Sequence, residues 1–150
     1  MNAQLKQKFL QQYKNTGLET SVSEASPHKL VSMLYEGALT KIARAKGFMQ
    51  RQQFKDKAAE IAKVTAILMN LRFNLDFEAG GEVALNLDAL YEYMNRRVLE
   101  AGRENSIEKL DEVADLIRTI KEGWDQMPEE FKNAPREKIE KVRQLKALNK

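Results

Sequence analysis

The chain has no cysteine, one histidine, three prolines and seven glycines among its 150 residues. Without cysteine, neither a disulfide framework nor a thiolate metal site can form. No apolar run approaches the roughly 18 residues that a membrane-spanning helix needs. The first eight residues, Met-Asn-Ala-Gln-Leu-Lys-Gln-Lys, also lack the apolar core of a secretory signal. We therefore expect a cytoplasmic protein that does not insert into a membrane.

The residues that are abundant favour helices. Apolar residues make up 43% and charged residues 31% of the sequence, a mixture typical of a folded globular domain. Alanine, leucine, glutamate, lysine and methionine lose little side-chain freedom in a helix. A chain of this length fits one domain, which would bury roughly 70% of the surface that its unfolded form exposes.

Four segments repeat apolar residues at the three- and four-residue spacing of an amphipathic helix. They cover about 26–51, 54–75, 82–103 and 105–127. Ser26 followed by Pro27 is a typical helix start, because serine caps free backbone N–H groups and proline fits the first helical turn. Gly80 and Gly81 indicate a turn between the second and third segments. Asn105 with Glu108 resembles a capping box at the start of the fourth.

The four apolar stripes predict the core. They are Leu30, Leu34, Ala38, Ile42, Ala45 and Met49; Ile61, Val64, Leu68, Leu71 and Leu75; Val83, Leu87, Leu90, Met94, Val98 and Ala101; and Ile107, Leu110, Ala114, Ile117, Trp124 and Met127. Short connections make successive helices antiparallel. The sequence thus predicts an all-α, antiparallel up-down four-helix bundle over 25–127, with an N-terminal leader at 1–24 and a basic C-terminal extension at 128–150 that holds a short helix.

Catalytic chemistry has few candidates in this sequence. His28 is the single histidine, and the residue three positions before it is Ala25, so the Glu-x-x-His metal motif of helical bundles is absent. One histidine without cysteine does not build a nucleophilic triad. Gly80-Gly81 lacks the Lys-Ser/Thr of a phosphate loop. We expect no enzyme activity, no metal and no cofactor.

Charge is distributed unevenly along the chain. Residues 132–150 hold seven Lys or Arg and two Glu, so this tail is strongly basic, whereas the preceding residues carry a net charge of −2. A basic tail is one route to nucleic-acid binding, but it holds no recognition motif and a solvated helix explains it more simply. Nucleic-acid binding that falls steeply with salt and requires residues 132–150 would favour that alternative.

The first two helical segments carry more apolar residues than one stripe needs. The surplus positions are Val31, Tyr35, Leu39, Ile67, Met69 and Phe73. Two interpretations remain open: broad faces packed in the core, or a groove that receives a helix of a partner.

Three stretches resemble the flagellar secretion chaperone family, FliS. Residues 25–38 read Ala-Ser-Pro-His-Lys-Leu-Val-Ser-Met-Leu-Tyr-Glu-Gly-Ala, residues 75–82 read Leu-Asp-Phe-Glu-Ala-Gly-Gly-Glu, and residues 90–97 read Leu-Tyr-Glu-Tyr-Met-Asn-Arg-Arg. They occur in the family's order, and the resemblance covers roughly residues 10–127. It implies an α-helical bundle that binds the C-terminal segment of flagellin in the cytosol, prevents premature polymerisation and keeps the client competent for export. A component of the flagellar export gate is a further candidate partner.

The resemblance also suggests residues for the client site. The family's leader carries an aliphatic residue and a tyrosine three apart, which Leu10 and Tyr13 match, and we expect these two to cover the groove until the client binds. For the groove we select Tyr35, Leu39, Ile67 and Phe73 from the surplus apolar positions. Two alternatives stay open: an adaptor for another secreted client, and self-association through an exposed groove.

The leader hypothesis predicts the behaviour of a Tyr13→Ala variant. If Tyr13 covers the groove in the free protein, losing its ring should change either the flagellin affinity or the midpoint of thermal unfolding. Titration calorimetry and a thermal melt measure the two quantities. An unchanged affinity together with an unchanged midpoint would rule out the covering role.

Overall fold

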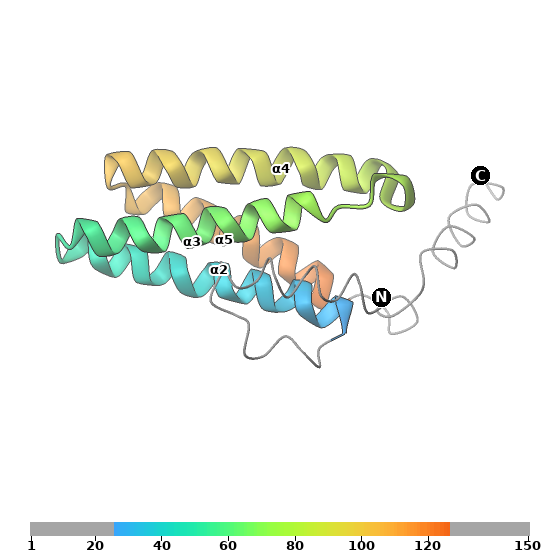
Figure 1. Ribbon diagram of the computed structural model, residues 1–150, viewed down its shortest axis with the longest axis horizontal. Helices are drawn as coiled ribbons and strands as arrows, with labels where there is room; N and C mark the ends of the chain where they lie inside the picture. The colour runs from blue at the N-terminus through green and yellow to red at the C-terminus, as the bar shows by residue number, and fades with distance from the viewer. Residues whose placement is uncertain (1–25, 127–150) are drawn as a thin grey trace.

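The computed structural model describes residues 26–126, which form four antiparallel helices (Figure 1). Their bounds are α2, Pro27–Gln50; α3, Phe54–Phe73; α4, Phe77–Glu104; and α5, Ile107–Asp125. Helices α2 and α4 each pack against both α3 and α5, so the cross-section is a square with α2 and α4 on one diagonal. The predicted all-α four-helix bundle is confirmed. None of the described helices is long and apolar enough to cross a membrane.

Side-chain caps define three of the four helix starts, those of α2, α4 and α5. The hydroxyl of Ser26 accepts a hydrogen bond from the backbone N–H of Lys29 at 3.1 Å, as the Ser-Pro pair predicted. At α5 the cap is Ser106, whose hydroxyl accepts from the N–H of Lys109 at 3.2 Å. The predicted capping role of Asn105 is therefore wrong. Asn105 instead ends α4 with φ 54°, a left-handed conformation that asparagine tolerates better than most residues.

The start of α4 also differs from the prediction, which placed a turn at 78–82. The helix begins at Phe77, and the Asp76 carboxylate caps it by accepting hydrogen bonds from the backbone N–H groups of Glu78 and Ala79. Gly81 then bends the helix, with φ 53° and ψ −128°, a conformation that side chains with a Cβ avoid. At Gly80 a Cβ would lie 2.8 Å from that of Ala84. The glycine pair is thus a kink inside α4 and not the connection before it.

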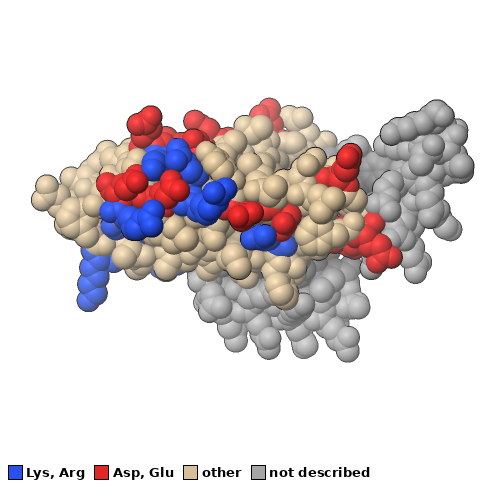
Figure 2. Space-filling model, turned by 90° about the horizontal axis from the view of Figure 1, so that it is seen from above, with Lys and Arg blue, Asp and Glu red and all other residues tan. Residues whose placement is uncertain are grey.

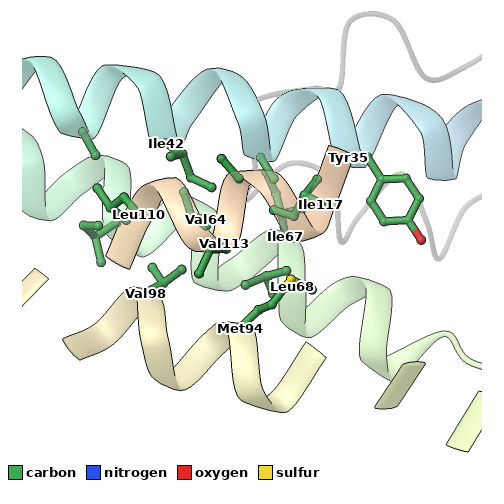
Figure 3. Packing of buried hydrophobic residues seen from close by; sticks show 14 of the residues in the cluster. Tyr35, Ile42, Val64, Ile67, Leu68, Met94, Val98, Leu110, Val113 and Ile117 are labelled. Carbon is green, nitrogen blue, oxygen red and sulfur yellow. The ribbon is translucent and has the colours of Figure 1, made fainter. Parts of the chain in front are cut away.

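The core is built largely from the predicted stripes (Figure 3). All six positions predicted in α2 are buried, and Leu75, Leu87, Leu90, Ile107 and Trp124 lie partly buried at the edge of the core, whereas Met127 lies outside the described residues. The core prediction is wrong at Val83, which is 66% exposed, whereas the neighbouring Ala84 is buried. The helical face that holds Met94 and Val98 reaches Ala84 and not Val83 at the α4 start.

A buried hydroxyl pair joins the two diagonal helices. The Tyr35 hydroxyl on α2 lies 2.6 Å from the Tyr91 hydroxyl on α4, and both side chains are buried. Burial, together with the neighbouring phenol, raises the pKa of Tyr35 well above its usual range, and burial raises that of Tyr91. Both rings therefore stay neutral and provide a directed polar contact inside an otherwise apolar core.

Polar contacts also join the helices at both ends of the bundle. At one end the His28 and Trp124 rings stack at 4.9 Å. The His28 Nε2 lies 2.7 Å from the Trp124 carbonyl, and the Trp124 Nε1 donates to the His28 carbonyl at 3.0 Å. At the other end the buried Lys57 ammonium donates to the Gly102 carbonyl and the Asn105 side chain. These contacts hold α2 to α5 and α3 to α4.

The tyrosine pair predicts a non-additive effect on stability. Tyr35→Phe leaves the Tyr91 hydroxyl buried without its partner, and we expect a loss of about 1–3 kcal/mol in the free energy of unfolding. Tyr35→Phe combined with Tyr91→Phe removes both polar groups, so its loss should be smaller than the sum of the two single losses.

Urea unfolding of the four proteins, followed by circular dichroism, measures this double-mutant cycle. Ser106→Ala, which removes the α5 cap, calibrates the assay with an expected loss of about 1 kcal/mol. Additive losses in the double variant would show that the two hydroxyls do not depend on each other.

Candidate functional site

The outward face of α3 carries no charged side chain over its last four turns. Small and apolar residues recur on it at spacings of three and four: Ala58, Ala62, Ala66, Met69 and Phe73. Four of these are exposed, including Met69 at 50% and Phe73 at 67%. Solvent-facing stripes of bundle helices are normally charged or polar. We call this row of five residues the α3 outer stripe.

The charged residues of the same part of α3 lie off the stripe and are held in ion pairs. Glu60 forms ion pairs with Arg44 on α2 at 3.2 Å and with Lys63 at 3.7 Å. Arg72 pairs with Asp88 on α4 at 2.6 Å. The ion pairs thus attach α3 to both neighbouring helices and leave its outward face apolar.

The apolar surface continues past the end of α3 onto the start of α4. Seven large apolar side chains in the described residues are exposed, and five of them lie between positions 69 and 85. They are Met69, Phe73, Phe77, Val83 and Leu85. The Asp76 cap and the kink at Gly81 place the short first turn of α4 here, at the end of the bundle where α3 meets α4 in Figure 1. We call these five residues the apolar end.

The opposite character is seen where α4 meets α5. Arg97 donates to both carboxylate oxygens of Glu112, and Lys109 pairs with Glu100 and Glu104. These bonds lower the pKa of Glu112, chiefly through Arg97, and that of Glu100, chiefly through Lys109. Figure 2 shows basic and acidic side chains mixed across this face. At the right-hand end of the described residues in that view, no basic side chain is seen. The charged side chains of this face therefore pair with one another.

The structure places the four predicted groove residues in three different environments. Tyr35 and Ile67 are fully buried, Leu39 is partly buried against the core, and Phe73 is 67% exposed. Phe73 is therefore the most exposed of the four predicted positions, and it belongs to both the α3 outer stripe and the apolar end. Leu10 and Tyr13 lie outside the described residues.

Sequence reasoning missed three residues of the apolar end. Phe77 lies between the second and third predicted helices, Val83 is predicted in the core, and Leu85 is in none of the predicted sets. The useful signal was the pair of glycines, because a kink at Gly81 changes which residues of the following helix face outward. Met69 was among the surplus positions but was not chosen.

The histidine and the two buried tyrosines have structural partners. His28 is held by Trp124, and the two buried tyrosines bond to each other. Within residues 26–126 no group of three or more His, Asp or Glu side chains is placed to hold a metal ion. The arrangement that the structure offers for function is therefore an apolar docking surface.

Comparison with known proteins identifies the family. The model of the flagellar protein FliS family matches residues 9–130. The flagellar secretion chaperone FliSB of Pseudomonas aeruginosa is 45% identical over 118 residues, which cover 79% of this chain and 94% of that protein. The flagellar secretion chaperone FliS of Vibrio cholerae is 40% identical over 124 residues, covering 83% and 91%. The FliS of Salmonella typhimurium is 39% identical over 116 residues, covering 77% and 86%.

These relatives are named as chaperones and not as enzymes, which agrees with the expectation that the chain is not an enzyme. The resemblance seen in the three sequence motifs is confirmed by a family match that extends over most of the chain. The chain belongs to the FliS family of flagellar proteins.

Proposed function

We propose that this protein is a cytosolic export chaperone that binds the C-terminal segment of flagellin, prevents its premature polymerisation and keeps it competent for export. The observation that carries the proposal is the α3 outer stripe, an uncharged helical face in a chain whose relatives are named flagellar secretion chaperones. The other parts of the hypothesis, an export-gate component as a further partner and covering of the groove by Leu10 and Tyr13, rest on the family resemblance.

The stripe suits an amphipathic helix of the client. Ala58, Ala62 and Ala66 project only a methyl group, so the backbone of a bound helix can approach α3 closely. Met69 and Phe73 then supply large side chains that lose contact with water on binding. Methionine adapts its shape to helical ligands, and a buried phenylalanine gains about 1.5–3 kcal/mol relative to an exposed one.

The apolar end extends this surface beyond one helix. A disordered segment that folds as it binds loses about 2–5 kcal/mol to ordering, so its interface must be large. Phe77, Val83 and Leu85 provide further apolar area next to Phe73 in the sequence. A client that follows α3 and then crosses the start of α4 would bury both parts.

Chaperone action requires only this burial. Flagellin termini that would otherwise associate with one another are occupied by the α3 surface, so binding competes with polymerisation by mass action. No nucleotide hydrolysis is needed for such competition. Tyr35, Leu39 and Ile67 stay predictions of the sequence, and they would reach a client only if side chains of the bundle repack.

The proposal predicts that charge on the stripe abolishes binding. Met69→Glu with Phe73→Glu places two carboxylates where the client's apolar side chains would lie, and each unpaired buried charge is strongly unfavourable. We expect the affinity for a flagellin C-terminal fragment, measured by titration calorimetry, to fall at least about 100-fold, equivalent to roughly 2.7 kcal/mol. Wild-type binding should show a large negative heat-capacity change.

Leu99→Glu is the matched control, because Leu99 is also half-exposed but lies toward the other end of α4. Its affinity should stay within about three-fold of wild type. An equal loss of affinity in the two variants would contradict the assignment of the binding site to α3, although flagellin would remain the client. No binding of the fragment to the folded wild-type protein would overturn the proposed function itself.

A further inference from the structure

The outer surface of α2 near its C-terminal end contains a hollow that the flagellin proposal does not use. It has a volume of about 530 Å³ and is lined by Thr40, Ala43, Arg44, Gly47, Phe48 and Arg51. Two guanidinium groups border it, whereas the α3 outer stripe has no charge. Residues 41–63 hold seven Lys or Arg and two Asp or Glu, but Lys46 pairs with Asp111 on α5 and Lys57 is buried against the end of α4, so the positive charge at the hollow comes from the two arginines.

The two arginines lie on one face of the helix. Arg44 and Arg51 are seven residues apart, which corresponds to about 10 Å along the axis and nearly two full turns. The buried carboxylate of Glu60 fixes Arg44 from one side at 3.2 Å. The Arg51 guanidinium lies 5.1 Å above the Phe48 ring and makes a 3.4 Å hydrogen bond to Gln53. Among the described residues, no carboxylate pairs with Arg51.

Gly47 shapes the floor of the hollow between the two arginines. Glycine inside a helix costs about 0.5–1 kcal/mol relative to alanine, so its presence needs a local reason. A Cβ at this position would lie 3.1 Å from an Nη atom of Arg51. The missing side chain therefore lets the Arg51 guanidinium lie close against the helix, where it borders the hollow.

We propose that this hollow is a docking site for an acidic helical segment of a second protein partner, distinct from the flagellin surface. Carboxylates seven residues apart on that segment would pair with Arg44 and Arg51, whose planar groups bind carboxylates through two hydrogen bonds. A small or apolar residue between the carboxylates would sit over Gly47 and beside Phe48. The charge complementarity comes from the two arginines that border the hollow.

The test uses a designed helical peptide of alanine and leucine with two glutamates seven residues apart. A control peptide of the same composition places them five residues apart, about 140° around the helix. Each is titrated at low salt into isotope-labelled protein and followed through backbone amide resonances. We expect saturable shifts over residues 40–51 with a dissociation constant of about 1 mM, because exposed ion pairs are individually weak. The control peptide should bind at least about three-fold more weakly.

Variants separate the hollow from general attraction between charges. Arg51→Gln and Gly47→Ala should each weaken binding at least about three-fold, the second without any change in net charge. Lys29→Gln removes an exposed positive charge elsewhere on α2 and should leave binding unchanged. Arg44 is kept intact because its loss would deprive the buried Glu60 of an ion-pair partner. The Arg51→Gln variant should also bind the flagellin fragment as wild type does, so the two proposals can fail independently.

Three results would overturn this inference. Equal weakening by Lys29→Gln would show non-specific attraction, and equal binding of the two peptides would show that the arginine spacing does not matter. Larger shifts over residues 40–51 with a single-stranded RNA oligonucleotide of the same charge would assign the hollow to nucleic acid instead.

Discussion

Burial of one side of α3 between α2 and α4 is the constraint on which the rest of the molecule depends. Ile61, Val64, Ile67, Leu68 and Leu71 turn into the core, and helical geometry then requires the α3 outer stripe to face away from it. The ion pairs from Arg44 and Arg72 fix the rotation of α3 from both sides. An apolar outer face is thus kept exposed by the same packing that stabilises the bundle.

The outer surface of the bundle has two contrasting parts, one charged and one apolar. Where α4 meets α5, Arg97, Glu100, Lys109 and Glu112 pair with one another across the helix boundary, which leaves few polar groups for a partner. On α3 the partner would supply what the bundle lacks, namely apolar contact over several turns. The Tyr35–Tyr91 pair lies between these surfaces and links the two diagonal helices through the core. A bundle with one apolar outer face is consistent with the proposed binding of a client segment.

Much of the fold could be predicted from the sequence because helical periodicity, the Ser-Pro cap and the scarcity of glycine agree with one another. The errors have local causes. A glycine pair fits either a turn between two helices or a kink within one helix, and the backbone angles at Gly81 show a kink. The prediction of Val83 as a core residue is wrong for this reason. Asn105 and Ser106 are adjacent, and both residue types can cap a helix. The left-handed conformation of Asn105 shows that it ends α4, whereas Ser106 caps the start of α5. The core stripe of α3 is predicted correctly, but periodicity does not show how wide the buried face is. Ile67 and Phe73 are therefore grouped in one predicted surplus, although Ile67 is buried and Phe73 is exposed.

The absence of cysteine permits a direct test of where the client binds. Single variants Ala62→Cys on the α3 outer stripe and Thr119→Cys on α5 each place one thiol at an exposed position, and alkylation rates report its accessibility. With saturating flagellin C-terminal fragment, we expect alkylation at position 62 to slow at least about ten-fold while the rate at position 119 is unchanged. An unchanged rate at position 62 in a complex shown to be fully formed would contradict the assignment of the client to α3.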